Sequence, residues 1–206
     1  MALSTFVKIS GITNLSDARY CAGMYVDLLG FAVEEASEKF ITPTQFNEIT
    51  GWVSGLEFVG EFTNYNGDQV LEILQSYPNL TWVEHDRIEP LEELEGKGVG
   101  LIYKMDLQEV RHIELEVAEK LNESGIIFHV ISTHEVLDEK DKEAIKLLSK
   151  NCRVILGVGI TAANVQDLIQ ELGLYGISLS GGEEIKPGLK DFDELADILE
   201  ALEVED

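Results

Sequence analysis

The sequence predicts an α/β fold, a single (βα)8 TIM barrel in which a parallel barrel is surrounded by outer helices. Two observations predict it. Eight apolar runs of strand length alternate with helix-forming segments along the 206 residues. Strict alternation requires parallel strands joined by right-handed crossovers, and eight such units close readily into a barrel. The last two runs end in glycine pairs, where such barrels hold phosphate. We therefore expect one domain over residues 1–206.

The composition is that of a globular protein without a membrane partner. Apolar residues make up 45% of the chain, and no apolar run reaches the roughly 18 residues that span a bilayer. The first residues, Met1–Val7, lack a basic leader followed by a long apolar core, so we see no secretion signal. We expect a cytoplasmic protein that is a monomer or a homodimer.

The charge restricts the classes of ligand. A formal net charge of −24 argues against nucleic acid as a partner, because its phosphates would be repelled. A small phosphorylated metabolite is still compatible, since helix N-termini supply local positive potential. The two cysteines and four histidines form none of the spacings typical of metal sites, so we expect no metal site.

The first strand, residues 5–10, places polar side chains inside the barrel. Period-two alternation puts Phe6, Lys8 and Ser10 on one face, and we assign that face to the interior. The prediction is that Ser10 lies at the upper rim and Lys8 one layer deeper. Both are then candidates for contact with a ligand.

The remaining elements follow from apolar periodicity and from capping residues. Asn14 or Ser16 can cap the first helix, and Thr42-Pro43 begins the second with proline in its first turn. The other expected strands are residues 26–33, 56–62, 80–85, 98–103 and 125–131, followed by runs that begin at Val154 and Tyr175. The expected helices are residues 17–22, 43–52, 67–76, 90–95, 110–124, 138–150 and 191–202, and one helix between the last two strands.

The two glycine-ended units, residues 154–161 and 175–184, predict a phosphate site. Glycine removes side chains where the backbone must approach a ligand closely, and a helix beginning directly after each pair would direct its N–H groups at the same place. The alternative is that these glycines only form tight turns. The candidate phosphate-binding residues are Gly157, Gly159, Ser180, Gly181 and Gly182.

Several stretches resemble the phosphoribosylanthranilate isomerase family. Residues 8–19 are similar to its opening pattern K-x-C-G-I-T followed by x-x-x-D-A, and residues 156–165 to its phosphate loop L-A-G-G-L-T-P-E-N-V. Residues 27–31, 40–43, 59–64 and 182–191 also resemble segments of this family. The resemblance covers both ends of the chain well and the middle less well.

The resemblance implies a cofactor-free ketol isomerisation in tryptophan biosynthesis. In that family the ribosylamine ring of N-(5′-phosphoribosyl)anthranilate opens and rearranges to a 1-deoxyribulose. A cysteine on the first strand is the general base and an aspartate ending the sixth strand is the general acid. The matching positions are Ser10 and Ser132 here, and an arginine for the anthranilate carboxylate falls at Lys39.

These departures leave two hypotheses open. A serine hydroxyl is a far weaker base than a cysteine thiol, whose pKa is about 8.5. The protein is therefore either an aldose–ketose isomerase with substitute groups or a non-catalytic phosphosugar-binding paralogue that acts as a sensor or partner subunit. Lys8, Lys39 and His85 are the candidates for substrate binding. Candidate substitutes for the base and the acid are Glu84, His85, Asp106 and His134, each of which could also be an ordinary surface residue.

Overall fold

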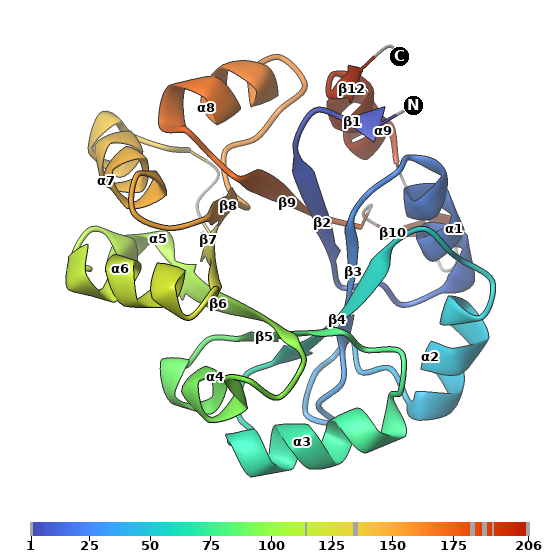
Figure 1. Cartoon of the computed structure of the whole chain (residues 1–206). Helices are drawn as coiled ribbons and strands as arrows, with labels where there is room; N and C mark the ends of the chain where they lie inside the picture. The colour runs from blue at the N-terminus through green and yellow to red at the C-terminus, as the bar shows by residue number, and fades with distance from the viewer. Residues whose placement is uncertain are drawn as a thin grey trace.

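Eight parallel strands close into a barrel in the computed structural model, and helices surround it (Figure 1). The predicted (βα)8 fold is thereby confirmed. The structure describes residues 2–113, 115–133, 136–181, 184–186, 189–190 and 192–204. The barrel strands are β2 (Phe6–Ser10), β3 (Leu28–Ala32), β4 (Glu57–Phe62), β5 (Trp82–His85), β6 (Gly100–Asp106), β7 (Ile127–Ile131), β8 (Val154–Leu156) and β9 (Gly176–Ser180).

Several helices begin at side chains that accept hydrogen bonds from free backbone N–H groups. Asn14 accepts from the N–H of Asp17, and Thr42, Asn66 and Asp138 each form a reciprocal capping box. The helices are α1 (Leu15–Gly23), α2 (Pro43–Thr50), α3 (Gly67–Ser76), α4 (Ile88–Leu94), α5 (Leu107–Val110), α6 (Leu115–Glu123), α7 (Glu139–Ser149), α8 (Val165–Leu172) and α9 (Asp193–Glu200).

Strands β2 and β9 close the barrel. Their register runs from Phe6 opposite Gly176 to Ser10 opposite Ser180. A side chain at position 176 would not fit, because its Cβ would lie 2.2 Å from the carbonyl oxygen of Phe6. Glycine is therefore the residue that lets these two strands approach to pairing distance.

The barrel interior is apolar in its lower part. Leu28, Val59, Ile102, Ile127 and Ile155 form a buried cluster there, against which Phe6 and Trp82 pack. The larger hydrophobic core lies between the strands and the surrounding helices. A barrel filled in this way has no pore, so a ligand has access only to an end of it.

Two predicted elements differ from the structure. The expected helix at 110–124 is two helices, α5 and α6, with a turn at residues 111–112 between them. The prediction that a helix begins directly after the second glycine pair is wrong. The backbone there forms two short antiparallel strands, β10 (Glu184–Lys186) and β11 (Leu189–Lys190), and α9 begins only at Asp193.

The loop after β4 is held by a buried carboxylate. Glu34 accepts from the backbone N–H groups of Thr63, Asn64 and Tyr65 at 2.9, 2.8 and 3.0 Å, and from the side-chain amide of Asn64. Burial alone would raise the pKa of Glu34, but these hydrogen bonds outweigh it and hold that pKa below its ordinary value. These N–H groups of the loop after β4 are therefore already bonded to a carboxylate from the segment that follows β3.

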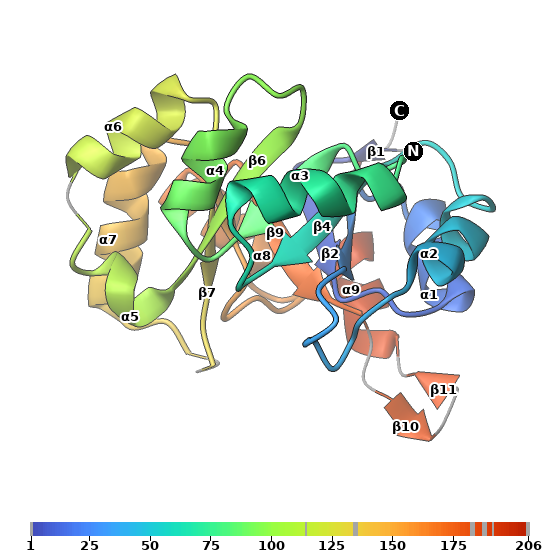
Figure 2. The same cartoon turned by 90° about the horizontal axis from the view of Figure 1, so that it is seen from below.

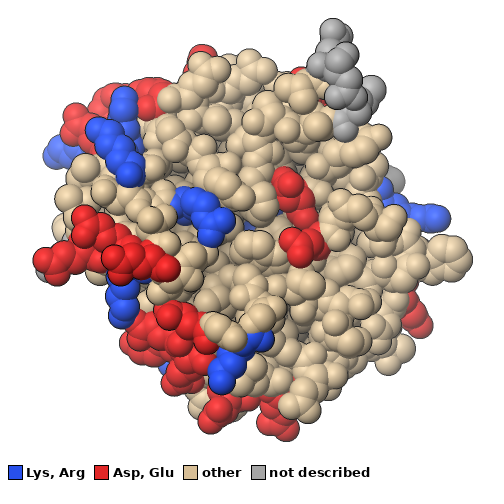
Figure 3. All heavy atoms as spheres, in the orientation of Figure 1, with Lys and Arg blue, Asp and Glu red and all other residues tan. Residues whose placement is uncertain are grey.

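Both chain ends lie at one end of the barrel. β1 (Ala2–Leu3) pairs with β12 (Glu203–Val204), and Figure 2 shows β1 on the side of the barrel opposite β10 and β11. Figure 3 views the end with the termini, where acidic side chains gather in groups along one side with Lys and Arg among them. Among the described residues, no helix has the length and apolar character to cross a membrane.

Candidate functional site

A buried lysine joins three strands inside the barrel. The Lys8 side chain is fully buried, and its Nζ donates to Ser10 Oγ at 2.6 Å and to Glu61 Oε1 at 2.8 Å. The same nitrogen lies 3.0 Å from Glu84 Oε2. These residues come from β2, β4 and β5, so their side chains meet in the barrel interior. The predicted interior placement of Lys8 and Ser10 is confirmed.

The charges of this group are mutually stabilised. Burial lowers the pKa of Lys8, but the carboxylates of Glu61 and Glu84 more than compensate and bring it above its ordinary value. Burial likewise raises the pKa of Glu84, yet Lys8 and His129 reverse this and bring it well below the usual range. Lys8 is therefore an ammonium, and Glu84 is an ionised carboxylate.

Glu84 also orients His129 on β7. Its Oε2 lies 2.8 Å from His129 Nδ1, and both side chains are buried. Burial lowers the pKa of His129, the Glu84 carboxylate opposes that change, and Lys8 and Lys104 reinforce it. Because an ionised carboxylate only accepts, Nδ1 carries the proton and Nε2 has the lone pair. Nε2 has no hydrogen-bond partner among the described residues.

Ser10 is arranged as a hydrogen-bond donor. An ammonium has donors only, so Ser10 Oγ accepts from Lys8 and keeps its own proton. That proton can be directed to Ser178 Oγ, 3.4 Å away, or to a ligand. This geometry favours donation by Ser10, in contrast to the role of base that the resemblance implied for its position.

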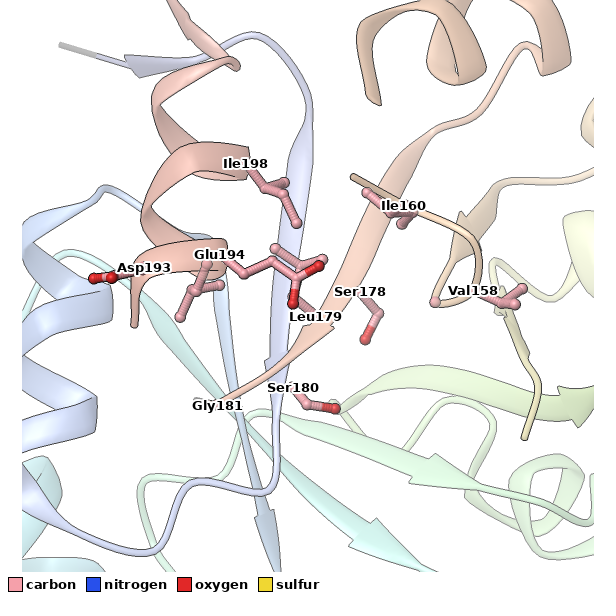
Figure 4. Close-up of a pocket in the computed structure, with 11 residues that line it drawn as sticks. Val158, Ile160, Ser178, Leu179, Ser180, Gly181, Asp193, Glu194 and Ile198 are labelled. Atoms are coloured by element: carbon pink, nitrogen blue, oxygen red, sulfur yellow. The ribbon is translucent and has the colours of Figure 1, made fainter. Parts of the chain in front are cut away.

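A cavity of about 500 Å³ opens beside these residues. Residues after β8 (157, 158 and 160), residues 178–181 at the end of β9 and residues from the start of α9 line it. In Figure 4, Ser178, Ser180 and Glu194 point toward the space between β9 and the loop after β8, and Asp193 points away. The side chains that point into the cavity thus include two hydroxyl groups and the Glu194 carboxylate.

The structure brings together part of the predicted phosphate site. Gly157, Ser180 and Gly181 line the cavity. The N–H of Gly157 is already bonded to Val130 O at 2.8 Å, and that of Gly181 to Ser10 O at 3.3 Å. Gly159, with φ of +69°, lies in a neighbouring depression. Gly182 lies outside the described residues.

Lys39 lies near Ser10 at the barrel mouth. If Gly11 carried a Cβ, that atom would be 3.0 Å from Lys39 Nζ, so the ammonium group lies directly over Gly11. Lys39 is exposed, and its charge is available to a ligand. Ser132 directly follows the last residue of β7, at the same end of the barrel.

The other candidates lie apart from Lys8 or already have structural partners. His85 is buried, with Nε2 2.8 Å from Tyr65 O and Nδ1 accepting from the N–H of Arg87 at 2.9 Å. Asp106 caps α5 by accepting from the N–H of Gln108. His134 lies outside the described residues.

Two residues of the interior group were missed by the sequence reasoning. Glu61 follows Val59 by two positions on β4, and His129 follows Ile127 by two positions on β7, where both apolar residues face the interior. Period-two alternation predicted that Lys8 and Ser10 face the interior, and the same signal could have identified Glu61 and His129. Within the described residues, no cluster of three His, Cys, Asp or Glu is arranged to hold a metal ion.

Known proteins resemble this chain over nearly its whole length. The family model described as N-(5'phosphoribosyl)anthranilate (PRA) isomerase matches residues 7–201. N-(5'-phosphoribosyl)anthranilate isomerase of Gloeothece citriformis is 26% identical, covering 95% of this chain and 93% of the relative. The enzyme of that name from Rubrobacter xylanophilus is 29% identical, with 89% and 92% covered.

Solved structures show the same fold. Phosphoribosyl anthranilate isomerase from Thermotoga maritima matches with a TM-score of 0.78 at 23% identity, covering 96% of this chain and 98% of that one. A second structure of an isomerase with that name contains reduced 1-(o-carboxyphenylamino)-1-deoxyribulose 5-phosphate. It matches with a TM-score of 0.75 at 22% identity and the same coverage.

Proposed function

Because the chain belongs to the N-(5'-phosphoribosyl)anthranilate isomerase family, we propose that it binds a phosphorylated sugar at the C-terminal mouth of its barrel and isomerises N-(5'-phosphoribosyl)anthranilate in tryptophan biosynthesis. The observation that carries the proposal is the buried Lys8 ammonium with Ser10, Glu61 and Glu84 around it. Burying charges costs stability, and such groups cluster at functional sites.

The reaction requires only proton transfers. A proton given to the ring oxygen opens the ribosylamine ring and leaves an iminium at C1. Removal of the proton from C2 produces an enolamine, and protonation at C1 with loss of the enol proton produces the ketone. All atoms and electrons of the substrate are retained, so no cofactor is required. The site must therefore provide a proton donor, a base and groups that hold the two anionic ends.

Two places at the mouth are suited to the anionic groups. The exposed Lys39 ammonium above Gly11 suits the anthranilate carboxylate. The cavity beside Ser178 and Ser180 suits the phosphate, since hydroxyl groups donate hydrogen bonds to phosphate oxygens. Glu194 opposes a dianion there, so its exposed side chain has to turn outward when the ligand binds.

Titration calorimetry and a turnover assay test the proposal together. The ligand for calorimetry is reduced 1-(o-carboxyphenylamino)-1-deoxyribulose 5-phosphate, and the substrate is freshly prepared N-(5'-phosphoribosyl)anthranilate. Saturable binding with measurable turnover is the expected result. Absence of binding would contradict the proposal.

Binding without turnover would favour a second candidate, a non-catalytic phosphosugar-binding protein. The observation that favours this candidate is that serines stand at the family's base and acid positions, and that Ser10 Oγ accepts from an ammonium. A Ser10→Cys, Ser132→Asp variant separates the two candidates, because it would restore turnover to a binder that lacks only these groups.

A further inference from the structure

We propose that Glu61 is the general base that removes the carbon-bound proton from the sugar. The inference rests on the proposed function, because it assigns a role within the same site. Glu61 lies on β4, two strands from Ser10, and its side chain is more exposed than the other titratable side chains of the interior group. It is 14% exposed, whereas Glu84 is 1% exposed and His129 is 2% exposed.

The Glu61 carboxylate is held in place by two neighbours. Oε1 accepts from Lys8 Nζ at 2.8 Å. On the adjacent strand, a Cβ at Gly30 would lie 2.2 Å from the same oxygen, so the absence of a side chain at Gly30 provides the space. The other oxygen, Oε2, has no hydrogen-bond partner among the described residues. One oxygen is thus fixed by the ammonium, and the other is available to a ligand.

The other polar groups are less suited to this role. Ser10 Oγ accepts from Lys8 and keeps its proton. Glu84 is buried between Lys8 and His129, and the buried His129 Nε2 has almost no contact with solvent. An ionised carboxylate beside an ammonium can accept a proton without first losing one. A general base must come within hydrogen-bond reach of the proton it takes, and Glu61 is the more exposed of the two carboxylates that lie against Lys8.

The step is balanced within the substrate and Glu61. The C2–H bond of the open-chain iminium breaks, its proton moves to Glu61 Oε2, and its electron pair forms the C1=C2 bond while the C1=N pair returns to nitrogen. Glu61 then delivers the proton to C1 as the enol hydroxyl loses its proton. That last proton replaces the one lent to the ring oxygen, so the protein ends in its starting protonation state.

The first test is Glu61→Gln. Glutamine retains an oxygen that accepts from Lys8, so the fold is preserved while the basic carboxylate is lost. Turnover of N-(5'-phosphoribosyl)anthranilate should fall at least about 100-fold, the contribution typical of a general base. Affinity for the reduced product analogue should change less than about threefold, because the reacting proton contributes little to binding. Glu61→Asp, which keeps a carboxylate, should regain part of the lost turnover.

Glu57→Gln is the matched control. Glu57 lies on the same strand, and the substitution changes charge by the same amount. Its carboxylate accepts from Trp82 Nε1 at 2.9 Å at the opposite end of the barrel. This variant should turn over at the wild-type rate. Equal losses in the two variants would overturn the assignment, because they would reflect a general effect of charge or stability.

Hydrogen exchange isolates the proton transfer from the rest of the reaction. The protein is incubated in D2O with 1-(o-carboxyphenylamino)-1-deoxyribulose 5-phosphate, and loss of the C1 hydrogen signal is followed by NMR. Wild type should exchange this hydrogen and Glu61→Gln should not. Equal exchange in both, or binding by the wild type without exchange, would overturn the role of Glu61. If the wild type did not bind 1-(o-carboxyphenylamino)-1-deoxyribulose 5-phosphate at all, that result would instead refute the proposed function.

Discussion

Glu194 is a carboxylate whose side chain points into the cavity proposed for the phosphate. Figure 4 shows it pointing into the same space as Ser178 and Ser180. Glu194→Gln removes a like charge from the neighbourhood of a bound dianion, so affinity for ribose 5-phosphate should rise about fivefold at low salt. Calorimetry measures the change.

Asp197→Asn provides the control for that experiment. It removes the same charge from the same helix, but Asp197 does not line the cavity. Its affinity for ribose 5-phosphate should stay close to that of the wild type. A similar gain in affinity in both variants would show that the overall charge governs binding, rather than the position of Glu194 beside the phosphate.

His129 should make the free energy of unfolding depend on pH. Its folded-state pKa is lowered by burial, with Glu84 opposing the shift and Lys8 and Lys104 supporting it. Below the unfolded pKa of about 6.5 the unfolded chain binds a proton that the native imidazole resists. Stability should therefore fall as the pH drops from about 7 through 6.5 toward the folded pKa.

Urea unfolding of the wild type and of His129→Asn at several pH values measures this contribution. The variant should show a shallower decline between about pH 7 and pH 5.5. A slope should remain, because the pKa of His85 is also lowered by its burial. Identical slopes in the two proteins would contradict the assignment of a neutral buried imidazole.

The sequence predicted which side chains face the barrel interior only where it also predicted which face of a strand points inward. Alternation along the first strand placed Lys8 and Ser10 correctly. The sequence could not show that Lys8 would meet Glu61 and Glu84, since these contacts join strands separated by 53 and 76 positions. His85 is next to Glu84 in the sequence, but the pleat turns it to the opposite face, where it bonds to the loop backbone.

At the scale of elements, the closure of β2 on β9 depends on Gly176. Gly176→Ala would place a methyl group 2.2 Å from the Phe6 carbonyl oxygen, so the strands would have to separate. We expect a loss of about 1–3 kcal/mol or more in the free energy of unfolding, the range observed when well-packed regions are overfilled. Chemical denaturation measures it.

Gly23→Ala is the contrasting substitution. Gly23 is the last residue of α1, and a Cβ there would meet nothing within 4 Å. Alanine has the higher helix propensity, so this variant should be unchanged or stabilised by up to about 1 kcal/mol. Destabilisation of similar size in both variants would mean that the contact with Phe6 is not the cause.

Most helices and strands could be predicted from local sequence signals. The two places where the prediction differs from the structure also have local causes. Asp106 caps α5 directly at the end of β6, so a helix starts earlier than apolar periodicity indicated and ends before α6 begins. After β9, the chain forms β10 and β11 before α9. A Pro-Gly dipeptide stands between these two strands in the sequence, and it is a signal that favours a turn over a helix.

At the scale of the whole molecule, the net charge of −24 should oppose the compact state. Like charges repel one another more strongly when the chain is folded, and salt screens this repulsion beyond about 10 Å at 0.1 M. The melting temperature should therefore rise by about a few degrees between low salt and about 0.3 M sodium chloride. Calorimetry with sucrose of matched osmolality as the control measures the effect. A constant or falling melting temperature would contradict it.

The carboxylate of Glu34 has a consequence for how the fold responds to small solutes. Three backbone N–H groups of the loop after β4 converge on that carboxylate. In a Glu34→Ala variant the same donors would face an empty space of carboxylate size and shape. Formate or acetate could enter it and restore the lost hydrogen bonds, a form of chemical rescue. The stability of that variant would then depend on the identity of the buffer acid, whereas the wild type is independent of it.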